Sequence, residues 1–253
     1  MRKLNLLIGL LLAGGPSAAT GQRTAAEIID QVDRILRGES SRGIATMEVL
    51  TEHWERSITM EVWSLGTEYS LARITAPKKE EGTATLKVGS EIWNYLPRVD
   101  RTIKIPASMM MGSWMGSHFT NDDIVKESRL IEDYEIEISY EGSRDGVRVW
   151  EFTLTPRPDV AVVWGSIEYQ VRQDDLMPTW ARYYDEDGKL MRSLTFHEFR
   201  VMGGRLVPAL MEMRPEDKPG ERTTVRYLEL EFDIGLDQSF FSLRSLRTGG
   251  REP

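Results

Sequence analysis

Apolar residues recur at helical spacing in one short stretch near the N-terminus of the chain. Thr24 can cap a helix here, and Glu27, three residues later, completes a capping box. Gly38 is expected to end the helix. Because the helix has a single apolar stripe, we expect it to lie against a sheet or across the mouth of one. The stripe consists of Ile28, Ile29, Val32, Ile35 and Leu36.

From Gly43 onward the pattern changes from helical to alternating, and segments of strand length follow one another with turn residues between them. The turns at residues 142–146, 185–188, 203–204 and 219–220 contain the glycine, aspartate and proline residues typical of hairpins. Strands do not alternate with helices, which argues against a doubly wound parallel sheet. We predict strands at residues 43–51, 57–65, 67–75, 83–88, 91–96, 101–105, 134–140, 147–155, 162–171, 179–184, 190–199, 205–213 and 223–232.

A run of consecutive hairpins forms an antiparallel meander, which protects its edges by closing, by nearly closing or by folding into a sandwich. Large inward side chains favour the barrel-like arrangement. We therefore predict a mainly β protein, a half-open antiparallel β-barrel with an N-terminal helix and a lid of loop or helix. The lid is the irregular stretch at residues 106–127. Because the sequence contains no repeat and no linker, residues 22–253 are expected to form a single domain.

Several predicted strands have one apolar face and one polar face. Such a dry face is either a solid core or the wall of a cavity, and alternation of this kind more often marks a solid core. Both alternatives stay open. The apolar positions are Ile58, Met60 and Val62 in one strand, Ala84, Leu86 and Val88 in a second, and Trp150, Phe152 and Leu154 in a third.

The predicted lid is rich in methionine. Methionine side chains are flexible and polarizable, so methionine-rich surfaces adapt to apolar ligands of variable shape. A lid of this composition suits acyl chains. The alternative is a buried loop that fills the barrel and binds no ligand. The residues concerned are Met109, Met110, Met111, Trp114 and Met115.

The first residues of the chain have the order typical of a secretory signal peptide. Two basic residues come early, residues 4–13 are mostly apolar, and small residues and turn formers follow at residues 14–19. The apolar run is too short for a membrane anchor, which needs roughly 20 apolar residues. We expect residues 1–21 to be a signal peptide, cleaved after Ala19 or Gly21, and the mature protein to be periplasmic.

The composition excludes several classes of protein. The chain has no cysteine, so disulfides, a lipidated N-terminal cysteine and thiolate metal sites are excluded, and the core must stabilise the fold. The formal net charge is −8, and the sequence contains no basic cluster. These features argue against nucleic acid as a partner and against a surface for anionic membranes.

Residues that could carry catalysis are few and isolated. The three histidines, His53, His118 and His197, have no second histidine or carboxylate pair at metal-ligand spacing. Adjacent acids occur at residues 122–123 and 174–175, but paired acids are more common at turns and helix starts than in active sites. The Gly-x-Ser-x-Gly elbow of hydrolases is absent. We predict no catalytic residue, no metal and no cofactor.

An ordered set of residues in the central part of the chain consists of Pro77, Gly82, Trp93, Tyr95, Pro97, Gly116, Ser117, Phe119 and Asp123. They fit a proline followed by Gly-Thr-Ala, a Trp-x-Tyr-x-Pro segment and a Gly-Ser-x-Phe-x-x-x-Asp signature. In this combination the chain resembles the outer-membrane lipoprotein-sorting protein family, specifically its LolA-like branch. His118 departs from the pattern, because relatives often have an acidic residue at this position.

The resemblance implies a half-open barrel with a concave apolar face, and a periplasmic carrier of lipids or lipoprotein acyl chains. It also implies an inner-membrane transporter and an outer-membrane acceptor as partners, with only transient membrane contact. We expect this carrier to be non-enzymatic; the alternatives are an envelope sensor or interaction module on the same scaffold, and a hydrolase. The candidate ligand-binding residues are Met60, Val62, Leu86, Trp93, Tyr95, Met109, Met110, Met111, Trp114, Met115, Trp150, Phe152 and Leu154.

Overall fold

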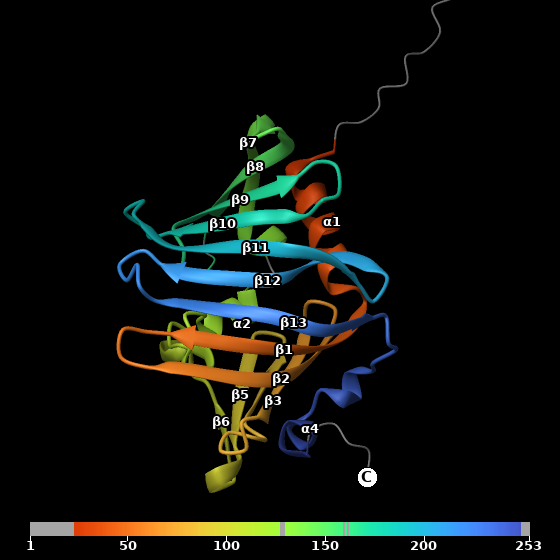
Figure 1. Ribbon diagram of the computed structural model, residues 1–253, viewed down its shortest axis with the longest axis vertical. Helices are drawn as coiled ribbons and strands as arrows, with labels where there is room; N and C mark the ends of the chain where they lie inside the picture. The colour runs from red at the N-terminus through yellow and green to blue at the C-terminus, as the bar shows by residue number, and fades with distance from the viewer. Residues whose placement is uncertain (1–22, 127–129, 159, 161, 249–253) are drawn as a thin grey trace, which may run out of the picture.

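The computed structural model describes residues 23–126, 130–158, 160 and 162–248. They form one antiparallel sheet of 13 strands in the order β6-β5-β4-β3-β2-β1-β13-β12-β11-β10-β9-β8-β7, with β6 and β7 at its two edges (Figure 1). The strands are β1 (Ser40–Leu50), β2 (Glu55–Leu65), β3 (Tyr69–Ala76), β4 (Ala84–Val88), β5 (Glu91–Leu96), β6 (Arg101–Lys104), β7 (Tyr134–Arg144), β8 (Val147–Pro156), β9 (Ser166–Arg172), β10 (Pro178–Tyr184), β11 (Leu190–Met202), β12 (Arg205–Pro215) and β13 (Arg222–Phe232).

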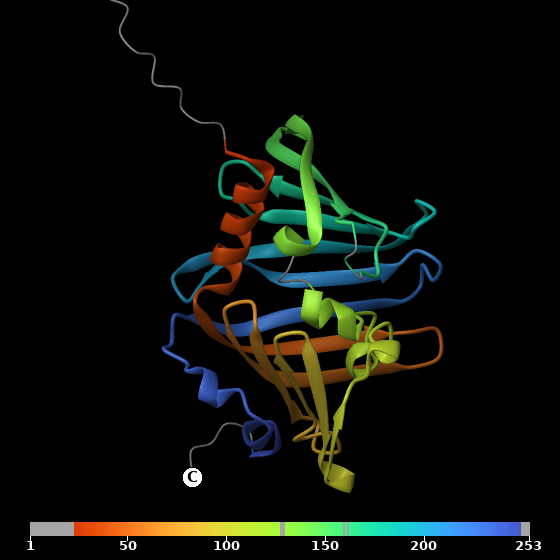
Figure 2. The ribbon, with the colours of Figure 1, turned by 180° about the vertical axis from the view of Figure 1, so that it is seen from behind.

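The chain builds the sheet in two halves. Strands β1 to β6 extend in one direction, and β7 to β13 return from the opposite edge until β13 pairs with β1. Residues 105–133, the crossing segment, connect the two edges. Figure 2 shows helix α1 and the crossing segment on the same face of the sheet, which we call the inner face. The crossing segment contains η2 (Ala107–Met109), η3 (Trp114–Gly116), α2 (Asn121–Lys126) and α3 (Leu130–Asp133).

Helix α1 (Ala25–Arg37) begins and ends where the sequence predicts. The Thr24 hydroxyl accepts a hydrogen bond from the Glu27 N–H at 3.2 Å, and the Glu27 carboxylate accepts one from the Thr24 N–H at 2.8 Å. This is the predicted capping box. The apolar stripe of α1 packs on Phe152 and Leu154 of β8, which confirms that the helix lies against the sheet.

All thirteen predicted strands occur, and their bounds differ from the prediction by a few residues. Strand β7 runs further than predicted because Asp145 and Gly146, with φ of 51° and 83°, make a tight two-residue turn into β8. Strand β9 begins at Ser166, four residues later than predicted. The mainly β, half-open antiparallel fold is confirmed.

Two C-terminal elements that the sequence did not indicate cover part of the outer face. They are η5 (Gln238–Phe240) and α4 (Leu243–Thr248), and Phe241 and Leu246 pack here on an apolar cluster of β2, β3 and β4. The sheet is therefore covered on its inner face by α1 and the crossing segment, and locally on its outer face by the C-terminal segment.

Strand pairing shows which residues face the C-terminal segment. Leu71 pairs with Leu86, and Leu86 pairs with Trp93, so all three side chains lie on one face, in the cluster that contains Leu246 of α4. Thr85 lies on the opposite face of β4. Its hydroxyl contacts the crossing segment there, so Leu86 and Trp93 face outward.

The prediction that Leu86, Trp93 and Tyr95 share a cavity wall with Met60 and Val62 is therefore wrong. The first three pack in the outer cluster, and the last two in the cluster beneath the crossing segment. The physical reason is that β4 is buried on both faces, so alternation could not show which face meets the lid.

Candidate functional site

The crossing segment covers an apolar surface on the inner face of β1, β2 and β3. Trp114 and Met115 of η3 pack on this surface together with Phe119 and Ile124. Trp114 is 8% exposed, and its indole Nε1 donates a hydrogen bond of 3.1 Å to the Thr85 hydroxyl. The strand residues of the surface, here called the inner apolar surface, are Ala45, Met47, Val49, Ile58, Met60, Ala72 and Ile74, with Val62 partly buried beside them.

Four of the predicted ligand-binding residues meet at this place. Met60 and Val62 come from β2, and Trp114 and Met115 from the crossing segment. Their sequence separation is about fifty residues, and they are brought together because the crossing segment returns over the first half of the sheet.

Other predicted residues lie elsewhere. Phe152 and Leu154 are fully buried beneath α1, with Trp150 packed beside them, in a cluster separate from the inner apolar surface. Met109 and Met111 are 54% and 57% exposed, so they do not face the sheet.

The η3 turn is built by hydrogen bonds within the crossing segment. The Trp114 N–H donates to the Phe119 carbonyl at 2.7 Å, and the Ser117 N–H donates to the Trp114 carbonyl at 2.9 Å. Met115 and Gly116 both have positive φ, at 48° and 72°. These two left-handed residues reverse the direction of the chain next to Trp114, whose side chain packs on the sheet. Gly116 adopts the left-handed conformation without the strain that a side chain would cause.

Helix α2 is tied to the methionine-rich loop. The Asn121 amide donates to the carbonyls of Met109 and Gly112, each at 3.1 Å. The Thr120 hydroxyl accepts from the Asp123 N–H at 3.1 Å, and the Asp123 carboxylate accepts from the Thr120 N–H at 2.7 Å. The adjacent acids at residues 122–123 therefore lie at a capped helix start, and loop and helix form one connected unit.

Arg192 of β11 joins this unit to the second half of the sheet. Its guanidinium makes a bidentate ion pair with Asp123 and donates to the His118 carbonyl at 3.1 Å. The side chains of Arg192 and Asp123 are only 5% and 13% exposed. The guanidinium carbon also lies 4.2 Å from the ring centre of Trp164 and 4.4 Å from that of Tyr183, and these two rings pack on each other with centres 5.4 Å apart, so the cation contacts both members of an aromatic pair.

His118 makes a further polar contact between the crossing segment and the sheet. Its N–H donates to the Thr223 hydroxyl at 3.0 Å, its Nδ1 lies 2.8 Å from the same hydroxyl, and its Nε2 lies 3.0 Å from a Glu221 carboxylate oxygen. Arg56 of β2 also contacts the crossing segment, because it donates to the Met115 carbonyl. Together with the hydrogen bond from Trp114 to Thr85, these contacts hold the crossing segment to the sheet at several separate points.

The hydrogen bond from His118 holds the pKa of Glu221 below its ordinary value of 4.5. A carboxyl with a lowered pKa in the folded state stabilises the protein above its ordinary pKa, and this contribution is lost as the pH falls through the lowered pKa. We therefore expect acid to weaken the fold of the wild type more than that of Glu221→Gln. Melting temperatures measured from neutral pH down to the acidic range test this, and parallel curves for the two proteins would contradict it.

Sequence reasoning missed Arg192, Arg56 and Glu221, although it singled out two of their partners. Asp123 belongs to the signature of the resemblance, and His118 is the residue that departs from it. A signal for Arg192 was present: in an alternating strand it occupies the face shared with Leu194 and Phe196, and an arginine on a buried face needs a carboxylate partner.

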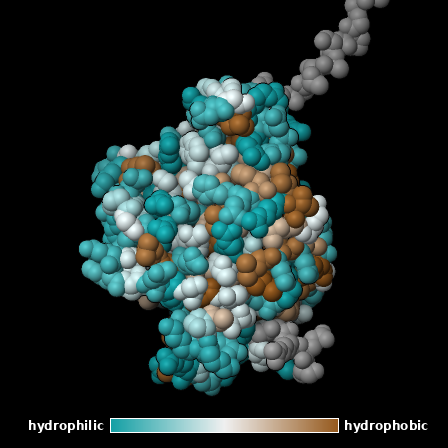
Figure 3. All heavy atoms as spheres, in the orientation of Figure 1, coloured by the Kyte–Doolittle hydropathy of each residue, from teal (hydrophilic) through white to brown (hydrophobic). Residues whose placement is uncertain are grey.

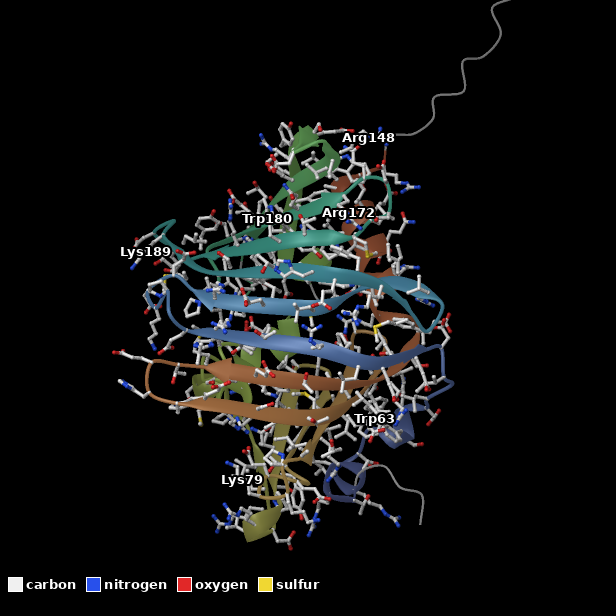
Figure 4. The ribbon with its side chains drawn as sticks, in the orientation of Figure 1. Trp63, Lys79, Arg148, Arg172, Trp180 and Lys189 are labelled. Atoms are coloured by element: carbon white, nitrogen blue, oxygen red, sulfur yellow. The ribbon has the colours of Figure 1, made fainter. Side chains whose placement is uncertain are left out.

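A polar groove of about 650 Å³ lies across β8, β9 and β10, and the sequence did not predict it. Arg172 and Trp180, labelled in Figure 4, line it. Glu151 in this groove already accepts hydrogen bonds from Arg144 and Gln170. Among the described residues, no three histidine or acidic side chains are placed to hold a metal ion. Hydrogen-bonding groups of this groove are therefore already paired with one another.

No helix in the described part of the chain is long and apolar enough to span a bilayer.

The open antiparallel sheet with a helix and a crossing segment on one face defines the class of fold, which is that of LolA-like proteins. A DUF1329 family protein from Desulfovibrio piger is 22% identical with a TM-score of 0.79, covering 88% of this chain and 97% of that one. A putative outer membrane lipoprotein-sorting protein domain from Vibrio parahaemolyticus is 22% identical with a TM-score of 0.78, covering 88% and 98%.

A LolA superfamily protein from Nitrosomonas europaea is 24% identical with a TM-score of 0.75, covering 88% of this chain and 99% of that one. These similarities confirm the LolA-like fold. A family described as "-like: Uncharacterized protein" matches residues 66–248, and the chain belongs to this family. No curated protein matches the chain.

Proposed function

We propose that the protein is a non-enzymatic carrier that binds acyl chains of lipids or lipoproteins on its inner apolar surface, beneath the crossing segment. One observation carries this proposal: an apolar sheet surface is covered by a segment that belongs to no strand and is held to the sheet by a few separate polar contacts. Such a cover can leave the sheet without breaking the strand ladder.

In this proposal the side chains of Trp114, Met115 and Phe119 occupy the place that an acyl chain takes when the crossing segment moves away. Met60 and Val62 then form part of the wall. Burial of each methylene contributes about 0.8 kcal/mol, which offsets the loss of the lid contacts. Because apolar side chains and acyl chains exchange for one another, binding and release are close to balanced.

The fold comparison also supports the proposed carrier function, since one of the similar structures is described as a putative outer membrane lipoprotein-sorting protein domain. Residues 1–21, which lie outside the described residues, have the order of a signal peptide, so we propose a periplasmic location and a mature N-terminus between Thr20 and Thr24. An inner-membrane transporter as donor and an outer-membrane acceptor belong to this proposal.

The absence of cysteine from the chain allows a direct test by an engineered disulfide. His118→Cys with Thr223→Cys places the pair where the crossing segment contacts β13 through a 3.0 Å hydrogen bond. Oxidation should lock the cover and weaken binding of a fluorescent fatty acid at least about tenfold, and reduction should restore it, because only the open form admits the ligand.

The two single-cysteine variants serve as controls, since each loses one of the two side chains and neither forms an intramolecular disulfide. Mass spectrometry confirms the cross-link. Equal fatty-acid affinity in the oxidised and reduced forms would show that the crossing segment is a permanent plug.

An interaction module on the same scaffold is the second candidate. Val201 and Leu228 are 72% and 51% exposed, and both line a groove of about 530 Å³ between β11 and β13. Exposed apolar side chains around a groove are typical of protein contacts. This function needs no opening of the cover, so the locked and reduced proteins would bind the partner equally.

A further inference from the structure

Three segments that are distant in the sequence meet at one end of the molecule. Gly82, in the turn between β3 and β4, lies against the ring of Pro97 in η1 (Pro97–Val99), at the tip of the β5–β6 hairpin. Arg247 of α4 makes an ion pair of 3.0 Å with Asp100 of the same tip. Figure 1 shows this hairpin tip at the lower extreme of the molecule, and the lower end is mainly hydrophilic in Figure 3.

The surface formed by these segments, here called the basic end, has a charge opposite to that of the whole chain. Its turn, tip and helix carry six basic and three acidic side chains, a net charge of +3, whereas the chain has a net charge of −8. The basic residues are Lys78, Lys79, Arg98, Arg101, Arg244 and Arg247, and the acidic residues are Glu80, Glu81 and Asp100.

Part of this positive charge is unpaired. Arg98, Arg101 and Arg244 make no ion pair with any described residue, and Lys78 and Lys79 have side chains that are 91% and 71% exposed. The carboxylate of Glu80 is engaged by Arg56, away from the tip. The basic end is therefore a positive surface open to an anionic partner.

The same tip exposes large apolar side chains. Val99 is 62% exposed, Leu96 38% and Ile103 of the edge strand β6 43%. Val99 directly follows Arg98 and stands two residues before Arg101, so four consecutive residues carry an exposed apolar side chain and two guanidinium groups.

We propose that the basic end docks the protein on an anionic lipid bilayer, with the hairpin tip at the headgroup level. Guanidinium groups interact there with lipid phosphates, and the apolar side chains enter the boundary between headgroups and acyl chains. An acidic protein surface would match the charge but would leave the exposed Val99 without a counterpart, so the bilayer fits both features. The proposal does not depend on acyl-chain binding.

Co-sedimentation of the chain from residue 22 onward with vesicles tests this. It should bind vesicles of phosphatidylcholine and phosphatidylglycerol at low salt, bind phosphatidylcholine alone much more weakly, and dissociate as salt screens the charges. Arg98→Gln with Arg101→Gln should weaken binding by roughly 30-fold, from about fivefold per basic residue near an anionic surface. Val99→Ser should weaken it by several-fold at every salt concentration.

Arg148→Gln with Lys189→Gln is the matched control, because it removes two exposed charges far from the basic end (Figure 4). This variant should bind vesicles like the wild type. Unchanged binding after the tip substitutions, or no preference of the wild type for anionic vesicles, would overturn the proposal, as would association with an acidic protein but not with lipid. Fatty-acid affinity in solution should stay unchanged in all variants, which separates failure here from failure of the carrier function.

Discussion

Replacing Arg192 with glutamine should lower the free energy of unfolding by about 3–5 kcal/mol, the usual effect of removing one partner of a buried ion pair. The substitution leaves the Asp123 carboxylate buried without its cation and deprives the His118 carbonyl of a donor. It also removes the cation that packs on the rings of Trp164 and Tyr183. Urea denaturation monitored by tryptophan fluorescence measures the change.

Arg148→Gln is the control for this prediction, because Arg148 pairs with Asp174 at a surface where both side chains are more than 60% exposed. Its loss should cost less than about 1 kcal/mol. The double variant Arg192→Leu with Asp123→Leu should recover part of the stability, since no charge is then left unpaired in the interior. A cost below about 1 kcal/mol for Arg192→Gln would show that water reaches the pair.

The elements that could be predicted from the sequence are those with local signals. The capping box that marks the start of α1 needs only the four residues from Thr24 to Glu27. The alternation of apolar and polar residues likewise identifies each strand without knowledge of the strands beside it. Turn residues such as Asp145 and Gly146 mark where the pattern restarts. The antiparallel architecture could be predicted from these elements, because consecutive hairpins allow few other arrangements of the strands.

The face of β4 could not be predicted because its polar residues are buried too. Thr85 and Lys87 are each 3% exposed on the inner side, where the Thr85 hydroxyl accepts from Trp114 and the Lys87 amine donates to the Thr67 carbonyl. A polar residue is tolerated inside when its hydrogen bonds are satisfied. The sequence shows the polarity of Thr85 and Lys87 but not these partners, so alternation assigned them to solvent.

The contacts that hold the crossing segment to the sheet could not be predicted from the sequence for a related reason. Arg192 and Asp123 are 69 residues apart, and nothing local to either residue indicates the other. The basic end is a similar case, since its three segments contribute two basic residues each and none forms a basic run. The fold, not the sequence order, concentrates the charge, so a surface with a net charge of +3 forms although the sequence contains no basic cluster.

The second large effect is expected for Trp114→Ala, which should lower the free energy of unfolding by about 3–5 kcal/mol, as large-to-small changes at buried aromatic residues do. Trp114 is 8% exposed, packs on the inner apolar surface and donates to Thr85. Trp114 therefore contributes packing like a core residue, although it belongs to the crossing segment that covers the sheet. Met111→Ser, at a side chain that is 57% exposed, should change stability by less than about 0.5 kcal/mol.

The same variant separates a gate from a plug when an acyl ligand is present. If the ligand takes the place of the indole, saturating fatty acid should restore much of the stability lost in Trp114→Ala, because a ligand present at 100 times its Kd stabilises the folded state by about 2.7 kcal/mol. Trp114→Phe keeps most of the packing but lacks the donor to Thr85, so it should fall between wild type and alanine. Thermal melts of the three proteins with and without fatty acid give the answer. A variant that stays destabilised at every fatty-acid concentration, while the wild type is not stabilised either, would show that the indole fills a core that no ligand enters.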